Sequence, residues 1–290
     1  ATAIVTITGS VIIPIKLLGK PSSAADQWFA TAEQLIAANA HDTMLCFTNR
    51  GKVYWLKVYE LPQAGRNAKG KPMVNLLPFE PGERLNAVLT TRDYPDDQYL
   101  IFATKSGTVK KTPLSEYSRP RSIGIIAINL RDDDELVDVA RTDGSRDIML
   151  FSDAGKAVRF NEESVRSMGR DATGVRGMNI DDGQRVIALC VVADSGDILT
   201  VTENGYGKRT PIADYTRKGK GCQGIIAIDT GERNGELVGA ALVSPADDLM
   251  LITSGGVLIR TKVEQVRETG RAAAGVKLIN LDEGETLVSI

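Results

Sequence analysis

The chain has 290 residues, of which 42% are hydrophobic and 25% charged, and its 35 Lys and Arg against 37 Asp and Glu give a formal net charge of −2. These values are ordinary for a soluble globular protein and allow a sizeable core. No apolar run approaches the length of a membrane span, the N-terminus lacks a signal segment, and the three scattered cysteines favour a reducing compartment, inert thiols and no metal site.

Most of the chain is built from one recurring module. The chain begins inside an apolar run, so it is expected to be a fragment of something longer, and only Ala24–Ala40 could form a helix, with a strand at its end. Each later module has an apolar run, Thr or Ser, a turn glycine and then basic residues. Its copies are Leu45–Tyr54, Ile101–Lys111, Met149–Arg159, Leu199–Arg209 and Leu251–Arg260, with turn glycines at Gly51, Gly107, Gly155, Gly205 and Gly255. A period of about fifty residues indicates a solenoid, propeller or array.

The second half of the module also recurs. Gly124–Ile128 is repeated letter for letter at Gly224–Ile228, with related versions at Gly174–Ile180 and Gly275–Ile279 and a looser one at Gly70–Leu77. The apolar runs are short, rich in β-branched residues and bounded by turn residues, which is typical of strands. Four strands in about fifty residues match a propeller blade. We therefore predict an all-β fold of six blades, five clear and one divergent over about 1–40, with Ile126 buried inside its blade.

The signs of the charges follow the module. Basic residues come after the turn glycine and in the next loop, whereas acidic residues lie between the last two strands, as in Asp132–Glu135. In a ring of blades this phasing predicts a basic belt that suits the DNA phosphate backbone without base recognition. The alternative is that exposed turns are simply charged. The predicted DNA-binding residues are Lys52, Arg66, Lys69, Lys71, Lys110, Lys111, Arg119, Arg121, Lys156, Arg159, Arg170, Lys208, Arg209, Arg217, Lys218, Lys220, Arg260 and Arg271; the same loops also hold Arg166 and Arg267.

From about residue 35 onward the sequence resembles the C-terminal domain of the bacterial DNA gyrase A protein. The resemblance is carried by His41–Thr43, Gly51–Tyr54, Asn75–Pro78, Gly107–Thr112, Gly174–Gly177 and Asn204–Thr210. It implies a single domain over 1–290, folded as a six-bladed β-pinwheel that exchanges strands between blades and wraps double-stranded DNA around a basic rim. It also implies partners, the catalytic N-terminal part of the gyrase A protein and the gyrase B protein, which use ATP for negative supercoiling.

The resemblance has one departure and implies no chemistry within the chain. The family's first-blade signature, a Gln followed by paired basic residues, Gly-Gly, a basic residue and Gly, is absent from Gly9–Trp28, and Gln63–Gly70 resembles a weaker second-blade version. No tyrosine directly follows an arginine, as the cleaving tyrosine of type II topoisomerases does, and there is no Walker loop. Asp132–Asp134 is better explained as a solvated turn than as a Mg²⁺ site.

We therefore expect a non-catalytic domain that uses no cofactor or metal and is monomeric when isolated. It would lie in the bacterial cytoplasm, away from the membrane. Two alternatives stay open, the equivalent domain of topoisomerase IV and a propeller that serves as a protein-interaction platform. A propeller hydrolase would need convergent carboxylates or histidines near the central channel, and His41 is the only histidine.

Overall fold

The computed structural model describes residues 5–7, 10–15, 34–61 and 76–290, and its regular structure is β-strand with five short 3-10 helices. Five of its sheets follow one plan, and we name them blades I to V. Blade I contains β4 (Thr43–Thr48), β5 (Lys52–Lys57), β6 (Leu85–Thr91) and β9 (Ile125–Ile126). Blade II contains β7 (Tyr99–Thr104), β8 (Thr108–Pro113), β10 (Leu136–Thr142) and β13 (Val175–Arg176). Blade III contains β11 (Asp147–Ser152), β12 (Lys156–Asn161), β14 (Val186–Val192) and β17 (Ile225–Ile226). Blade IV contains β15 (Asp197–Thr202), β16 (Tyr206–Pro211), β18 (Leu237–Val243) and β21 (Val276–Lys277), and blade V contains β19 (Asp248–Thr253), β20 (Leu258–Lys262) and β22 (Leu287–Ser289).

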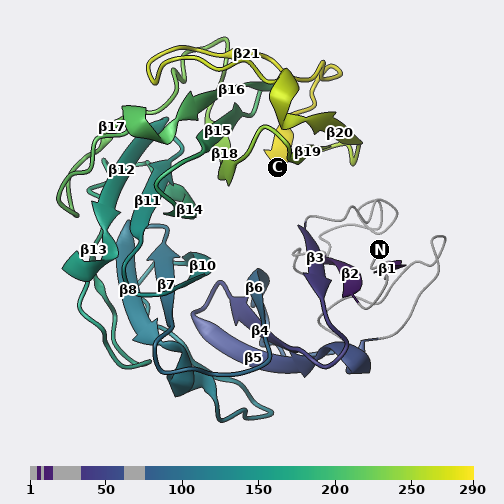
Figure 1. The fold of residues 1–290 in the computed structure, drawn as a ribbon, viewed down its shortest axis with the longest axis vertical. Helices are drawn as coiled ribbons and strands as arrows, with labels where there is room; N and C mark the ends of the chain where they lie inside the picture. The colour runs from purple at the N-terminus through teal and green to yellow at the C-terminus, as the bar shows by residue number, and fades with distance from the viewer. Residues whose placement is uncertain (1–4, 8–9, 16–33, 62–75) are drawn as a thin grey trace.

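Neighbouring blades exchange strands, as the resemblance implied. In blade I the order across the sheet is β6-β4-β5-β9, and the outermost strand β9 belongs to the module whose other strands form blade II. Blades II, III and IV likewise receive β13, β17 and β21 from the module that follows each of them. The blades form an open arc with β6, β10, β14 and β18 toward its middle and the exchanged strands on the outside (Figure 1). The all-β pinwheel prediction is therefore confirmed.

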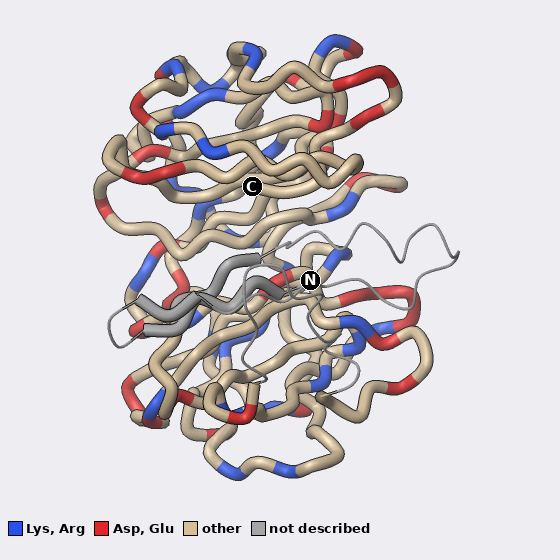
Figure 2. Tube along the Cα trace, turned by 90° about the vertical axis from the view of Figure 1, so that its right-hand side faces the viewer, with Lys and Arg blue, Asp and Glu red and all other residues tan. Residues whose placement is uncertain are grey.

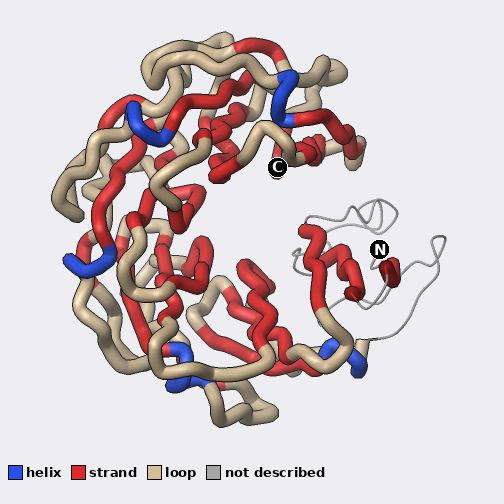
Figure 3. The backbone as a smooth tube through the Cα atoms, in the orientation of Figure 1, coloured by secondary structure: helices blue, strands red, loops and turns tan. Residues whose placement is uncertain are grey.

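A 3-10 helix follows the second strand of every blade, and in blades II to V it starts the crossing to the previous blade. These helices are η2 (Val58–Glu60), η4 (Leu114–Tyr117), η5 (Glu162–Ser164), η6 (Ile212–Asp214) and η7 (Val263–Gln265), and they lie along the outer perimeter of the arc (Figure 3). The segment between each of η4 to η7 and the exchanged strand is called a crossing loop below. The four crossing loops are residues 118–124, 165–174, 215–224 and 266–275.

The turn glycines are required by the exchange itself. Gly51 has φ +72, and its carbonyl accepts hydrogen bonds from Ala127 N (2.8 Å) and Ile128 N (3.1 Å) as the exchanged chain leaves β9. A Cβ on Gly51 would stand 2.5 Å from the Ile128 carbonyl oxygen, so only glycine fits. In blade V the left-handed residue is Gly256 (φ +85), one position after the predicted Gly255.

The hydrophobic core lies between blades, which explains the strands that are apolar on both faces. Strands β4 and β11 are buried along their whole length. Phe47 of blade I packs edge-on against Phe102 of blade II at 5.6 Å between ring centroids, and Tyr117 joins the same cluster. Four of the five clusters of buried apolar side chains are shared by two blades, so neighbouring blades depend on each other for burial.

The number of blades differs from the prediction. The repeat forms five blades, not six, in the described part of the chain. The N-terminal strands β1 (Val5–Ile7), β2 (Ser10–Ile15) and β3 (Gln34–Ala38) form a separate three-stranded sheet. Its central strand is β2, the second in the chain, whereas the first strand of each blade is central in blades I to V. This N-terminal sheet is therefore built on another plan than blades I to V.

Candidate nucleic-acid interface

Several of the basic residues on the strands after the turn glycines point into the structure. In blades II, III and IV the side chain of the fourth residue after the turn glycine contacts the next module. Lys111 Nζ donates to the Glu162 carbonyl oxygen (2.9 Å), Arg159 Nη1 to Ile212 O (2.9 Å), and Arg209 Nε to Val266 O (2.8 Å). These carbonyls lie in or beside the 3-10 helices, so the cations hold the start of the next crossing loop.

Two lysines one position earlier are completely buried. Lys110 Nζ donates to the carbonyl oxygens of Ala127 (2.5 Å), Gly169 (3.2 Å) and Arg170 (2.6 Å), and burial lowers the pKa of Lys110 from 10.5 to about 7. Lys208 Nζ donates to the carbonyl oxygens of Gly270 (2.7 Å) and Arg271, and burial lowers its pKa to about 8. Each lysine thus anchors the crossing loop of the following module to β8 or β16.

The structure therefore reassigns part of the predicted DNA-binding set. The buried lysines cannot reach a phosphate while these hydrogen bonds persist, and Lys111, Arg159 and Arg209 are committed to contacts between blades. Their basic side chains looked like a surface belt because the sequence does not reveal that another module's crossing loop covers them. Three more predicted residues are paired with carboxylates: Lys52 with Glu80 (2.5 Å), Lys156 with Asp181 (3.0 Å), and Arg260 with Asp248.

The other predicted cations lie on the crossing loops. Arg119, Arg121, Arg217 and Lys218 are exposed, and Arg170, Lys220 and Arg271 are half-buried. Of these exposed cations, Arg217 forms an ion pair with blade III, in which its Nη2 lies 2.9 Å from an Asp147 carboxylate oxygen. Arg66, Lys69 and Lys71 fall outside the described residues. Exposed cations thus recur on consecutive crossing loops along the outside of the arc, and Figure 2 shows Lys and Arg at every level of it.

Two cations and two isoleucines of the exchanged strands were missed. The second residue of the exchanged strand points outward in every blade that has one, and it is Ile126, Arg176, Ile226 and Lys277 in blades I to IV. The prediction that Ile126 is buried is wrong, since 50% of it is exposed. The signal was present in the sequence, because Gly-Ile-Ile and Gly-Val-Arg or Gly-Val-Lys alternate from module to module.

The acidic segment Asp132–Glu135 stabilises a hairpin turn. Asp134 of the Asp132–Glu135 segment accepts hydrogen bonds from the backbone N (2.9 Å) and the Oγ (2.6 Å) of Ser106, at the tip of the β7–β8 hairpin. In the described ranges no three His, Cys, Asp or Glu side chains converge as metal ligands would. Cys46 and Cys190 are buried, and burial raises the pKa of each thiol to about 12, as expected for inert cysteines.

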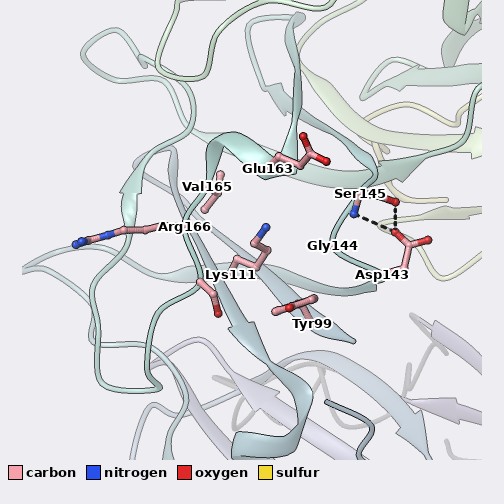
Figure 4. A pocket seen from close by; sticks show the side chains of 9 residues that line it. Tyr99, Lys111, Asp143, Gly144, Ser145, Glu163, Val165 and Arg166 are labelled. Atoms are coloured by element: carbon pink, nitrogen blue, oxygen red, sulfur yellow. Dashed lines mark hydrogen bonds between the residues drawn. The ribbon is translucent and has the colours of Figure 1, made fainter. Parts of the chain in front are cut away.

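An open pocket of about 430 Å³ lies where blades II and III meet (Figure 4). Tyr99, Lys111, Asp143 and Arg166 are among its lining residues. Asp143 accepts hydrogen bonds from Ser145 N (3.1 Å) and Ser145 Oγ (2.7 Å), and these bonds lower the pKa of its carboxyl to about 2. Lys111 and Asp143 are thus engaged in contacts that hold the walls of this pocket.

Three of the seven tyrosines are part of the core. Tyr54, Tyr117 and Tyr215 are buried, and burial raises the pKa of each hydroxyl. No helix among the described residues is long and apolar enough to cross a membrane. The recurring exposed cations of the crossing loops are therefore the most distinctive surface feature of the arc.

Comparisons with known proteins place the chain in one family. The family model described as "DNA gyrase C-terminal domain, beta-propeller" matches residues 42–92, 98–143, 146–192, 196–244 and 247–290, which are five segments for five blades. The DNA gyrase A protein of Neisseria gonorrhoeae is 52% identical over an alignment of 301 residues that covers 89% of this chain and 33% of that protein. The chain thus spans about a third of the length of the curated relatives it matches.

Two solved structures are similar over most of their length. "Structure of DNA gyrase A C-terminal domain" has a TM-score of 0.80 at 24% identity, covering 99% of this chain and 97% of that one. "Crystal structure of the C-terminal domain of DNA topoisomerase IV" has a TM-score of 0.79 at 26% identity, covering 92% of this chain and 85% of that one. The first of these likenesses bears on the fold alone.

Proposed function

The chain belongs to the DNA gyrase C-terminal domain family, and on that premise we propose that it binds double-stranded DNA along its outer rim without sequence preference. The bound duplex would be wrapped, and wrapping would support ATP-dependent negative supercoiling by a gyrase holoenzyme. The cytoplasmic partners in that assembly would be the catalytic N-terminal part of the gyrase A protein and the gyrase B protein. Residues 1–290 would act as one non-catalytic domain, with DNA cleavage and ATP hydrolysis outside it.

One observation carries the proposal: exposed cations occupy equivalent crossing loops of successive modules. They are Arg119 and Arg121, then Arg166, then Arg217 and Lys218, then Arg267. Equivalent positions in successive blades form a track that follows the outside of the arc. A repeated track of single cations suits a polyanion of uniform spacing, and such contacts fix a duplex in place without recognising its bases.

The energetics favour dispersed contacts over one strong site. Bending a stiff duplex costs roughly 1–6 kcal/mol for each 20–30 base pairs at moderate angles. Because that cost accumulates along the wrap, contacts must recur along the wrap as well. The net charge of −2 does not oppose this, since the exposed cations of the crossing loops and the acidic segments such as Asp132–Glu135 lie in different parts of each module.

The first experiment incubates the purified chain with relaxed closed circular DNA and a nicking-closing topoisomerase, at low and moderate salt. A salt-sensitive change in linking number is the expected result, and its sign gives the handedness of the wrap. Binding without a change in linking number would contradict wrapping but not binding. Failure to bind at low salt would overturn the proposal and favour the protein-interaction alternative.

A second measurement tests the crossing loops directly. The variant Arg119→Gln plus Arg121→Gln is expected to weaken binding equally on unrelated duplexes. It should also reduce the slope of log affinity against log salt by roughly 0.9 for each phosphate that the variant no longer neutralises. The matched control is Lys105→Gln, an exposed lysine on the β7–β8 hairpin away from the crossing loops. An unchanged slope in the arginine variant would remove these residues from the interface.

A domain of topoisomerase IV is the second candidate, favoured by the structural similarity at 26% identity. The curated relatives at about 50% identity, in contrast, are gyrase A proteins. A complementation assay distinguishes the two, because a chimeric gyrase A protein that carries this chain should introduce negative supercoils if the gyrase assignment is correct.

A further inference from the structure

The outward positions of the exchanged strands alternate in chemistry around the arc. Ile126 and Ile226 are 50% and 52% exposed, whereas the same position carries the exposed cations Arg176 and Lys277 in the intervening blades. The two isoleucines are equivalent by structure as well as by sequence, since Lys52 faces Ile126 and Lys156 faces Ile226 in the strand register. An exposed apolar side chain therefore recurs at every second blade.

Each isoleucine is accompanied by an arginine of the next module. Arg170 Nη1 donates to Ile126 O (3.5 Å) and Arg271 Nη1 donates to Ile226 O (2.8 Å). These arginines belong to the two crossing loops whose backbone is held by buried lysines, Lys110 at Arg170 O and Lys208 at Arg271 O. A buried lysine, an arginine and an exposed isoleucine thus recur as a set, once between blades I and II and once between blades III and IV.

Ile126 and Ile226 do not join into one apolar patch, and Ile123, in the crossing loop just before Ile126, is also 74% exposed. Docking surfaces for proteins are contiguous apolar areas of several hundred Å², whereas these two side chains stand in different blades. Cations accompany the same outer edge, as where the half-buried Arg170 donates to Ile126 O. Single apolar side chains beside cations are what DNA-bending proteins present to the minor groove, whose walls are sugars and whose edges are phosphates.

We propose that Ile126 and Ile226 make apolar contacts in the minor groove of the wrapped duplex, where it faces the protein. Arg170 and Arg271 would support these contacts from the groove edge. The inference rests on the proposed function and deepens it, because it names the groove and the uncharged residues that meet it. An apolar contact to sugars needs no particular base, which agrees with binding that lacks sequence preference.

The test compares wild type with Ile126→Thr plus Ile226→Thr. Threonine keeps the β-branching that suits a strand while replacing the apolar side chain. Affinity for a linear duplex is expected to fall about fivefold for each partly buried isoleucine, roughly 25-fold for the pair. The slope of log affinity against log salt is expected to stay unchanged, because no charge is removed. The control is Val288→Thr on β22, which is 47% exposed but lies at the edge of blade V where the inner strand stands in other blades.

Methylation interference identifies the groove. Methyl groups on adenine N3 lie in the minor groove and those on guanine N7 in the major groove. Adenine methylation is expected to weaken wild-type binding overall, and the double threonine variant should lose that sensitivity.

The outcomes separate the two proposals. If wild type binds DNA and the threonine variant binds equally well, the minor-groove inference is wrong while the proposed function stands. Interference at guanine N7 alone would also overturn it, as would a lowered salt slope in the variant. If wild type itself does not bind DNA, the proposed function fails first, and the isoleucines would then be sites for another partner.

Discussion

Replacing Lys110 by methionine tests whether a buried cation holds the crossing loop of the next blade. The substitution keeps the apolar stem and removes three hydrogen bonds, to the carbonyl oxygens of Ala127, Gly169 and Arg170. Leaving a buried carbonyl without a donor costs about 1–3 kcal/mol, so three cost about 6 kcal/mol at the middle of that range. The methionine variant also avoids the free-energy cost of burying a charged group. Lowering the lysine pKa from 10.5 to about 7 corresponds to about 5 kcal/mol. Near pH 7 the two effects nearly cancel, and we expect the variant to be about 1 kcal/mol less stable.

The difference in stability between wild type and the methionine variant is expected to depend on pH. Because the folded pKa of Lys110 is below its unfolded value, the unfolded chain binds more protons between pH 7 and 10.5, and wild type gains stability as the pH rises through that window. Methionine cannot titrate. The stability gap between the two proteins should therefore grow by up to about 1.4 kcal/mol per pH unit, to about 3 kcal/mol at pH 9 because Lys110 is already half deprotonated at pH 7.

Melting curves of both proteins at pH 7 and pH 9 measure this gap, at roughly 2–4 °C for each kcal/mol in a chain of this size. Lys105→Met, an exposed lysine of the same blade, is the control and should follow wild type at both pH values. A gap that stays constant from pH 7 to 9 would refute the reasoning, since Lys110 would then hold the same charge throughout.

Two other substitutions probe the strand exchange and the contact between blades. Gly155→Ala is expected to destabilise the chain by about 2–4 kcal/mol, because the residue has φ +70 and its Cβ would stand 2.4 Å from the Ile228 carbonyl oxygen. The control is Gly183→Ala, because Gly183 has φ +82 but a Cβ there would have nothing within 4 Å. Equal shifts in melting temperature for the two variants would contradict a steric role for the exchanged strand. Asp147→Asn is expected to cost about 2–4 kcal/mol near neutral pH by leaving Arg159 with a weaker partner. Burial opposes ionisation of Asp147, but hydrogen bonds from Arg217 and Arg159 outweigh it and hold the pKa of Asp147 below 3.8. The resulting stabilisation is present above pH 3.8 and is lost as the pH falls through the folded pKa. The melting temperatures of wild type and the asparagine variant should therefore converge in acid. Parallel curves down to pH 2 would remove Asp147 from that account.

Much of the architecture was predictable from local patterns. Fifty-residue spacing of Gly51, Gly107 and Gly155, with short β-branched runs between them, predicted blades of β-strand, and those runs fold as predicted. Strands such as Ile148–Phe151, apolar on both faces, predicted burial between blades. The blade number was wrong because the N-terminal segment was counted by its position in the series, whereas its described strands form a sheet with a different strand order.

The candidate interface was only partly predictable. Lys110 and Arg121 are both basic residues in turn-rich segments, and nothing local distinguishes the completely buried one from the exposed one. The isoleucine at 126 has the composition of a core residue, yet its exchanged strand is at the outer edge of a blade and half of it faces solvent.

The sequence by itself determined the repeat, the strand content and the placement of glycine at each close approach, because these depend on residues that are neighbours in the chain. Only the tertiary structure decided which cations are free, which are committed to carbonyls of the next module, and which apolar side chains face outward. The physical reason is the strand exchange: the groups that cover Lys110 belong to Gly169 and Arg170, about sixty residues away in the chain, and no local pattern specifies such a contact.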